Sequence, residues 1–474
     1  MYGTVVRREL TESWREGRTP ALAALLVLLA VAAALTGWQQ VAAVQADRDA
    51  ARVLDRESWE SQGTRNPHSA AHFGQYAFRP QPLLSVVDPG ISEFAGTAIW
   101  LEAHYQNVGA HRPVEDATEI ARFGTLSLAW VLQVVLPLVV LVMTATMVAA
   151  ERERGTLRQL LATGQSPGHL LGAKLLAAVV TLVLIGLPLL ALLWLGARAF
   201  VPADPLPDTA SRATAITLGY AAYALVFVTA GVAISALARS PRGALALALG
   251  AWVVAVVLVP RVATDLGERL HPVPEANAFW ATVRADMAAG PDGETPQSAR
   301  RAQLLDALLD EYGVGSEAEL PVNFAGYFLQ AEEEWGNEVF DRHFGELWAR
   351  YRDSERVRQR FALLSPTLAM SRLSMGMAGT DLAHQQHFVS DAEAHRRDII
   401  ERLNMDMAEH GAGQGFRYMG DETLWREIPD FDYRAPTLAG LGAGYRVDAA
   451  VLGAWLLVAI ALLVFAARRT GLRD

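Results

Sequence analysis

The sequence predicts an all-α polytopic membrane protein with six transmembrane helices and a mainly helical extracytoplasmic domain between helices five and six. Two observations predict this fold class. First, 52% of the 474 residues are apolar and the mean hydropathy is positive, which is high for a soluble chain of this size. Second, the apolar residues gather in six blocks long enough to cross a bilayer, and arginines cluster in short segments between them.

Each apolar block is a predicted membrane helix, and the fifth is the shortest. The six helices are expected at 19–38, 123–150, 170–196, 213–237, 244–260 and 448–467. On the cytoplasmic side we expect an amphipathic interfacial helix at 1–18, a coupling loop at 151–169, a loop at 238–243 and a tail at 468–474. On the outer side we expect a first segment at 39–122, a short loop at 197–212 and the large helical domain at 261–447.

The arginines set this orientation. They precede the first helix, lie between the second and third and between the fourth and fifth, and follow the sixth. Because basic residues are retained in the cytoplasm, both termini of this multi-pass protein are expected there. Glu9, Glu12 and Glu16 precede the first helix, whose apolar stretch exceeds that of a signal peptide, so an uncleaved helix is expected.

Charge and composition exclude several classes of protein. The net charge of −10 argues against a nucleic-acid partner. The chain has no cysteine, so it forms no disulfide and no thiolate metal site. The segment from Gly168 to Lys174 lacks the adjacent Gly-Lys-Ser/Thr of a phosphate-binding loop, because Ala173 separates Gly172 from Lys174. No nucleotide site is therefore expected in this chain.

The segments outside the bilayer are expected to be mostly helical. Tyr2, Val6, Leu10 and Trp14 recur at i, i+4 spacing, which predicts an amphipathic helix on the inner membrane surface, with a frayed tail as the alternative. The stretch 41–59 is helix-prone, and the proline- and glycine-rich stretch after it indicates irregular structure. In the large domain, apolar stripes of helical period occur at 304–309, 324–351 and 399–407.

The loop after the second membrane helix carries the strongest functional signal. Glu151 and Glu153 continue that helix, and Gly155-Thr156 is expected to break it. Leu157, Leu160 and Leu161 then form a small apolar ridge on a short helix, and Pro167 helps to turn the chain back. Such a ridge fits a groove on a partner, with the flanking charges fixing orientation; an ordinary solvated connector is the alternative.

These residues resemble the first cytoplasmic loop of permease subunits of ABC-2 type ABC transporters. The pattern is E-x-E-x-G-T-L-x-x-L-L, a turn with proline, and G-x-K, ending here at Lys174. Many members place a proline soon after the Leu-Leu pair, whereas this chain has Thr163-Gly164 there and Pro167 later. A narrower resemblance is to the subgroup with a large DUF3526 domain before the last helix. It is carried by 71–74, 88–90, 101–107, 365–366, 379–381, His384, Phe388 and 396–397.

The resemblance implies a non-catalytic permease subunit that pairs with a second permease, as a homo- or heterodimer, in the lipid bilayer. It also implies two separate ABC ATP-binding subunits, which carry the ATP and Mg, with no cofactor in this chain. Gln133 and Pro137 in the second helix, and Tyr220 and Tyr223 in the fourth, are candidates for a pathway or dimer interface; ordinary packing is the alternative.

The sequence contains candidate metal-binding side chains, but it does not predict a metal site. Imidazole and thioether groups bind Cu(I) or Zn, and the candidates in the large domain are His384, His387, Met375 and Met377. His68 and His72 lie at i, i+4 spacing in the first outer segment. Surface and packing roles are favoured for all of them. We expect no sub-micromolar transition-metal affinity in the isolated 261–447 domain, which calorimetry would check.

The favoured function, which follows from this resemblance, is that of a permease subunit of an ATP-driven ABC-2 type transporter in a bacterial inner (plasma) membrane, with export favoured over import. One alternative is a mechanotransmission subunit that acts on a periplasmic partner without moving a substrate through the membrane. The other is a membrane-anchored extracytoplasmic metal-binding or sensor protein. The sequence does not identify a substrate.

Overall fold

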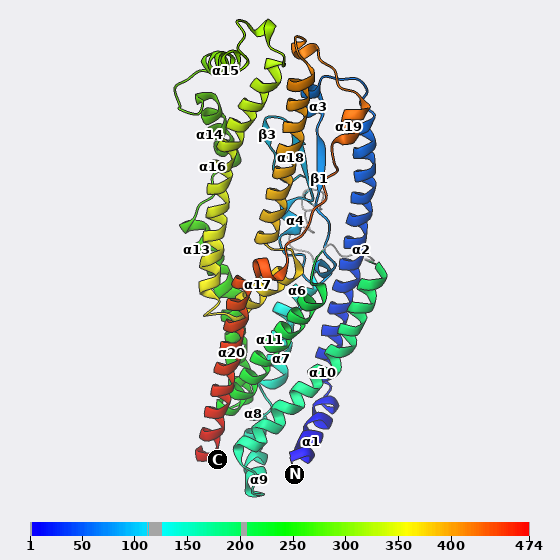
Figure 1. Cartoon of the computed structure of the whole chain (residues 1–474). Helices are drawn as coiled ribbons and strands as arrows, with labels where there is room; N and C mark the ends of the chain where they lie inside the picture. The colour runs from blue at the N-terminus through cyan, green and yellow to red at the C-terminus, as the bar shows by residue number, and fades with distance from the viewer. Residues whose placement is uncertain (1, 111, 113–125, 201–205, 474) are drawn as a thin grey trace.

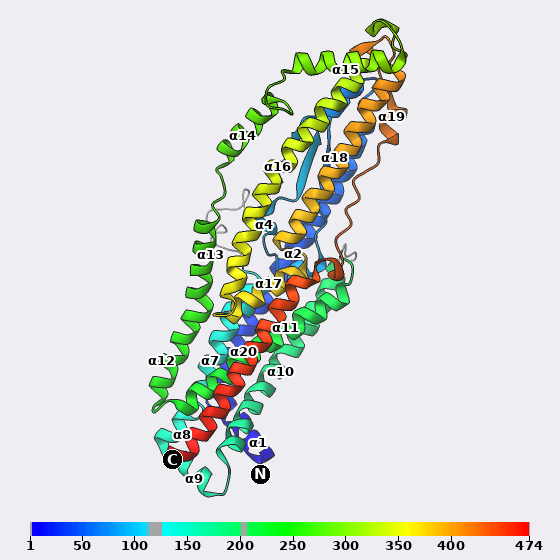
Figure 2. The same cartoon turned by 60° about the vertical axis from the view of Figure 1, so that its left-hand side comes forward.

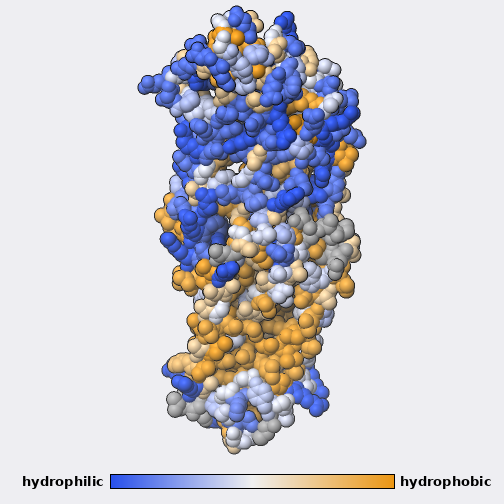
Figure 3. All heavy atoms as spheres, in the orientation of Figure 1, coloured by the Kyte–Doolittle hydropathy of each residue, from blue (hydrophilic) through white to orange (hydrophobic). Residues whose placement is uncertain are grey.

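The computed structural model describes residues 2–110, 112, 126–200 and 206–473, and it is an elongated helical molecule (Figure 1). On the face shown in Figure 3, an apolar band crosses the lower part of the molecule, and the upper half has a mostly hydrophilic surface. We call the hydrophilic half the distal domain; it comprises the end of α2, residues 61–110 and α14–α19. Both termini lie at the opposite end of the molecule, beside the short helix α9 (Figure 1).

Six helical stretches are long and apolar enough to cross a membrane, as the sequence predicts. They are Arg18–Glu60, Leu128–Arg154, Pro167–Gly196, Thr209–Leu237, Pro241–Leu270 and Gly444–Thr470. The corresponding elements are α2 (Arg18–Glu60), α6 (Leu128–Trp130) with η3 (Val131–Val135), α7 (Leu136–Thr144) and α8 (Ala149–Arg154), α10 (Pro167–Phe200), α11 (Thr209–Leu237), α12 (Pro241–Trp252) with η4 (Val253–Leu258) and α13 (Val259–Leu270), and α20 (Leu438–Arg473). Helix α1 (Tyr2–Arg15) precedes them, and α9 (Thr156–Ala162) lies between the second and third.

The first membrane helix does not stop at residue 38. Helix α2 runs unbroken for 43 residues, so the helix-prone stretch 41–59 is its continuation into the distal domain. Trp59 near its end is fully buried there, and its indole nitrogen donates to the carbonyl of Trp425 at 2.8 Å. A single helix therefore links the membrane to the distal domain.

Two membrane helices contain a π-helical turn, and each turn ends just before a proline, Pro137 or Pro260. A proline has no N–H to donate back along the helix, so a carbonyl one turn earlier loses its partner. The hydroxyl of Tyr223 donates to the carbonyl of Gln133 at 2.7 Å, and the hydroxyl of Ser365 donates to the carbonyl of Ala255. Contacts between elements thus satisfy backbone groups that the bilayer could not.

The distal domain is built on two long helices that lie side by side, α16 (Phe324–Phe361) and α18 (Leu382–His410) (Figure 2). Helix α17 (Pro366–Ala378) joins them and packs against the outer ends of α11 and α20. The smaller elements are α3 (Pro67–Phe73), η1 (Leu83–Val86), α4 (Ser92–Ala95), α14 (Ala276–Ala289), α15 (Gln297–Tyr312), η5 (Glu317–Glu319), η6 (Gly415–Arg417) and α19 (Glu422–Glu427).

A small antiparallel sheet lies where the sequence indicated only irregular structure. Its order is β1 (Gln75–Phe78), β2 (Ala98–Glu102) and β3 (Tyr105–Gln106), with Gln75 opposite Leu101 and Glu102 opposite Tyr105. The hydrophobic core of this region joins the sheet to α3, α18 and α19. The first outer segment and the large domain are therefore packed together as one body.

Candidate functional site

The segment between the second and third membrane helices folds as two short helices joined at a glycine. Helix α8 ends at Gly155, whose φ of 74° is in the left-handed region, and α9 begins at Thr156. Left-handed backbone costs little only for glycine, so this position fixes the turn between α8 and α9. Gly164, with φ of 86°, ends the segment before α10 begins at Pro167.

A buried ion cluster ties this segment to two other helices. The Lys174 ammonium of α10 lies 2.7 Å from the Glu9 carboxylate of α1 and 3.0 Å from the Glu151 carboxylate of α8. Their side chains are 1%, 8% and 9% exposed, respectively, and Lys174 also donates to the carbonyl of Met147. Burial raises the pKa of Glu9, while Lys174 acts in the opposite direction. A buried charge is tolerated only when it is paired, so the three helices are locked together here.

The leucine ridge packs against the chain's own core and is not exposed for a partner, as the sequence had predicted it to be. Leu157 is only 1% exposed and packs in the chain's own core with Val148, Leu170 and Val232. Leu160 and Leu161 are partly buried against the same core. The residues that α8 and α9 expose to solvent are Glu153, Arg154, Arg158, Gln159 and Ala162. Polar groups, rather than an apolar ridge, therefore form most of the accessible face.

The polar candidates of the second and fourth membrane helices, Gln133, Tyr220 and Tyr223, are joined in one buried network. The Gln133 amide donates to the Tyr220 hydroxyl at 2.9 Å, and that hydroxyl lies 3.0 Å from the hydroxyl of Ser374. The Tyr223 hydroxyl lies 2.9 Å from that of Thr367. Ser374 and Thr367 both belong to α17, so the network links the second and fourth membrane helices to the distal domain. A role for these residues in a pathway or dimer interface stays a prediction.

Two motif segments that are far apart in sequence meet above this network. The Thr380 hydroxyl donates to the carbonyl of Asp88 at 2.9 Å, and the amide of Ile91 donates to the carbonyl of Thr380 at 3.0 Å. Gly90 has φ of 52°, and a Cβ there would lie 2.4 Å from the Thr380 carbonyl oxygen. Only glycine permits this close approach of residue 90 to Thr380. The Asp88 side chain beside it is buried, and burial is the main cause that raises its pKa to about 6.

The metal candidates of the large domain have other roles. His384 is buried, with Nδ1 at 2.6 Å from the Asp381 carboxylate and Nε2 at 3.2 Å from the guanidinium of Arg212. Both of its ring nitrogens are therefore engaged. Met377 is buried in the core beside the membrane helices. The ring of His387 packs on Tyr433, and Met375 lines a different cavity from His384.

Three histidines do gather elsewhere in the distal domain. His68 and His72 share one face of α3, and His104 lies in the turn between β2 and β3; their ligand atoms lie within 4.8 Å of one another. Burial chiefly lowers the pKa of His68 to about 4. Burial opposes ionisation of Glu333, yet hydrogen bonding to His104 and the charge of Arg396 hold its pKa below the usual value. The sequence signal for His68 and His72 was their i, i+4 spacing; nothing pointed to His104.

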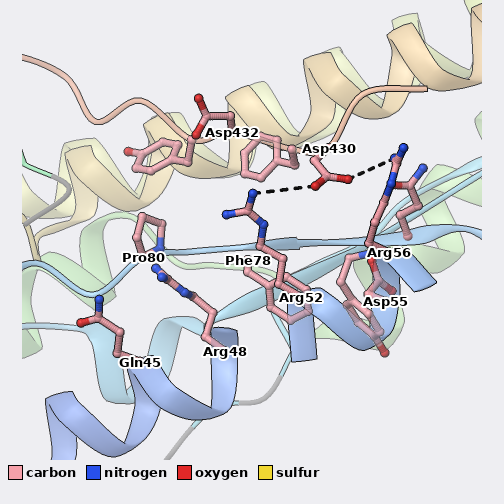
Figure 4. Close-up of a pocket in the computed structure, with 13 residues that line it drawn as sticks. Gln45, Arg48, Arg52, Asp55, Arg56, Phe78, Pro80, Asp430 and Asp432 are labelled. Atoms are coloured by element: carbon pink, nitrogen blue, oxygen red, sulfur yellow. Dashed lines mark hydrogen bonds and ion pairs between the residues drawn. The ribbon is translucent and has the colours of Figure 1, made fainter. Parts of the chain in front are cut away.

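A charged cavity of about 280 Å³ lies between α2 and the segment after α19 (Figure 4). Arg48, Arg52 and Arg56 from α2 line it, facing Asp430 and Asp432. The Asp430 carboxylate lies 3.1 Å from the Arg56 guanidinium and 3.7 Å from that of Arg52. Asp430 thus pairs with two of the three arginines, and these ion pairs connect α2 to the segment after α19.

Fold and site together define a multi-pass membrane protein. At the end of the molecule where both termini lie, it carries the short charged helix pair α8–α9, which buried ion pairs between side chains fix to the membrane helices. Two family models match the chain, that of the ABC-2 family transporter protein at residues 115–265 and that of the domain of unknown function DUF3526 at residues 276–434. No curated protein matches it. The order of an ABC-2 family transporter region followed by DUF3526 matches the subgroup that the sequence motifs resemble, and it supports a permease-type membrane subunit. The family association implies ABC ATP-binding subunits as partners.

Proposed function

We propose that this chain is the membrane subunit of an ATP-driven exporter, in which separate ATP-binding subunits, holding ATP and Mg, act on the α8–α9 segment. The arginines at the end of the molecule that carries α9 and both termini support a cytoplasmic location for this end. In this arrangement the distal domain is extracytoplasmic, and two permease subunits, identical or different, complete the membrane unit.

The observation that carries the proposal is the ion cluster of Lys174, Glu9 and Glu151. It connects α8, which continues the second membrane helix, with α1 and with the start of the third. A force applied to the exposed charges of α8 and α9 therefore acts on three helices together. An ordinary loop would move alone and transmit nothing.

The path continues to the far side of the membrane through α17. Its residues Ser374 and Thr367 bond to the tyrosines of the fourth membrane helix, and Ser365 before it bonds to the fifth. A change in the packing of these membrane helices thus alters the contacts through which α17 holds the distal domain on them. This coupling supports communication between ATP hydrolysis and events on the outer face.

A second candidate function, mechanotransmission without flux, is favoured by the unbroken helix α2. A helix that runs from the membrane into the distal domain carries movement outward even when no pathway opens. The discriminating experiment reconstitutes the complex in vesicles and measures ATPase activity and substrate flux together. ATPase stimulation by a distal partner without flux would favour mechanotransmission over export.

The docking face is tested by reversing its charges. Arg154→Glu combined with Arg158→Glu should abolish binding of the partner ATP-binding subunit, because both side chains are exposed on the proposed docking face. Arg434→Glu in the distal domain, where the side chain is 90% exposed, is the matched control and should bind normally. Unchanged binding by the double variant would contradict the proposal.

Orientation is tested separately with single cysteines, because the chain has none of its own. Glu311→Cys on α15 should react with a membrane-impermeant maleimide in intact cells (spheroplasts, if an outer membrane blocks the reagent). Gln159→Cys on α9 should react only after permeabilisation of the inner membrane. Both positions are exposed in the structure, so labelling reports the side of the membrane. The reverse pattern would refute the cytoplasmic placement of the docking face.

A further inference from the structure

We propose that His68, His72 and His104 form a binding site for a divalent transition-metal ion, with Zn²⁺ as the ion that the arrangement suits. Imidazole nitrogens are good ligands for Zn²⁺, and three protein ligands plus a water are a common zinc coordination. The site lies in the distal domain, and its three ligands all lie outside 261–447. The inference does not depend on the transport proposal.

The geometry brings the three rings around a common point. Ring centroids are 4.7 Å apart for His68–His72, 5.2 Å for His68–His104 and 5.1 Å for His72–His104. The ring planes are inclined to one another by 79°, 54° and 62°, so the rings are not stacked. Zn–N bonds of 2.0–2.1 Å at tetrahedral angles need nitrogens about 3.4 Å apart. Small side-chain rotations achieve this, since His72 is exposed.

His104 is held ready by its surroundings. It has φ of 67°, a left-handed conformation that is uncommon for a residue with a side chain and is often kept where function needs it. Its backbone N–H donates to the Glu333 carboxylate at 2.8 Å, and its Nδ1 lies 2.6 Å from the same oxygen. A carboxylate that binds Nδ1–H leaves the Nε2 lone pair for a metal, as is usual for metal-binding histidines.

The carboxylate is itself fixed. The Arg396 guanidinium lies 3.2 Å from the other Glu333 oxygen and 2.8 Å from Glu393, and all three side chains are buried. Arg396 also donates to the carbonyl of Glu102, next to the turn that holds His104. The chain therefore supplies both the ligand and the outer partners that orient it.

Helix α3, which carries the other two ligands, is also pinned. The Asn66 side chain accepts from the amide of His68 at 2.9 Å and donates to the carbonyl of Tyr418 at 3.0 Å. At its other end, a Cβ on Gly74 would lie 2.7 Å from the Leu101 carbonyl oxygen, so α3 lies directly on β2.

Simple packing accounts poorly for the cluster. Within the part of the chain that the structure describes, no ring nitrogen of His68 or His72 has a hydrogen-bond partner, although both rings are fixed beside a third imidazole. Packing would be served as well by apolar side chains. Exposure of His72 leaves a side of the cluster open to water, which fits an exchangeable ion rather than a closed structural one.

The test uses the purified full-length protein, freed of metal by chelation, and calorimetric titration with Zn²⁺. We expect one Zn²⁺ per chain for the wild type, with loss of this site in His72→Gln and in His104→Asn. Asparagine tolerates the left-handed backbone, so the second variant keeps the turn. His410→Gln, at an exposed histidine of the distal domain, is the matched control and should retain the site.

Two further readouts separate ligation from folding. Glu333→Gln should weaken Zn²⁺ binding by about 10–100-fold, as loss of an outer-shell partner does. Co²⁺ should give a visible absorption spectrum with the wild type that is absent in His72→Gln, while both proteins keep the same circular dichroism. Failure of the wild type to bind micromolar Zn²⁺, or equal binding by His72→Gln, would overturn the inference.

Discussion

Replacing Lys174 with methionine should be among the most damaging single changes in the chain. Lys174→Met removes the one cation between Glu9 and Glu151, whose side chains are only 8% and 9% exposed. Removal of one partner from a buried ion pair typically costs about 3–5 kcal/mol, because a buried charge is left uncompensated. That loss is a large part of the total stability of an ordinary domain, about 5–15 kcal/mol.

The assay is equilibrium unfolding in detergent micelles, monitored by circular dichroism. Exposed Arg154→Met on the same helix pair is the matched control and should change stability by less than about 0.5 kcal/mol. The triple variant Glu9→Gln, Glu151→Gln, Lys174→Met should recover most of the loss, since it leaves no buried charge. A loss below about 1 kcal/mol in Lys174→Met, or a triple variant as unstable as the single one, would refute this account.

The remaining predictions concern the junction between the membrane helices and the distal domain. Burial raises the pKa of Asp88 to about 6, from about 3.9 for an ordinary aspartate. The stability of the fold should therefore fall as pH rises from about 4 to 6, by up to about 3 kcal/mol. Thermal melting should show this fall in the wild type and not in Asp88→Asn. The new methyl group in Gly90→Ala should clash with Thr380 and lower the unfolding free energy by more than about 2 kcal/mol in the same assay. Gly63 also has a positive φ but open space around it, so Gly63→Ala should cost only about 1 kcal/mol. Equal effects of the two variants would contradict the close approach of Gly90 to Thr380. Tyr223→Phe should cost about 1–3 kcal/mol in unfolding free energy, because it leaves a carbonyl freed by a proline without a donor; a neutral effect would contradict the role given to that hydroxyl.

The membrane helices could be predicted because their signal is local. About 20 consecutive apolar residues specify a crossing helix whatever surrounds it. The strands could not be predicted, since they contain only 4, 5 and 2 residues, too few for an alternating pattern to stand out. The continuity of α2 was also missed, because a change from apolar to charged residues marks the membrane boundary and not the end of a helix.

Parts of the site depended on distant contacts that no local pattern contains. Lys174 and Glu151 were candidates from the loop, but their companion Glu9 lies 165 positions from Lys174. The spacing of Leu157, Leu160 and Leu161 predicted a ridge without its direction, which the left-handed Gly155 sets by turning Leu157 inward. His104 joins the histidine pair of α3 only because β2 and β3 return the chain to that helix.

Because α2 is unbroken, a small rotation at its inner end produces a larger displacement at its outer end. At 1.5 Å per residue, its 43 residues form a rod about 65 Å long. A tilt of about 5° around its inner end would carry Trp59 sideways by about 5 Å, roughly one helical pitch. Rotations of the membrane helices that are too small to open a pore would thus still move the distal domain.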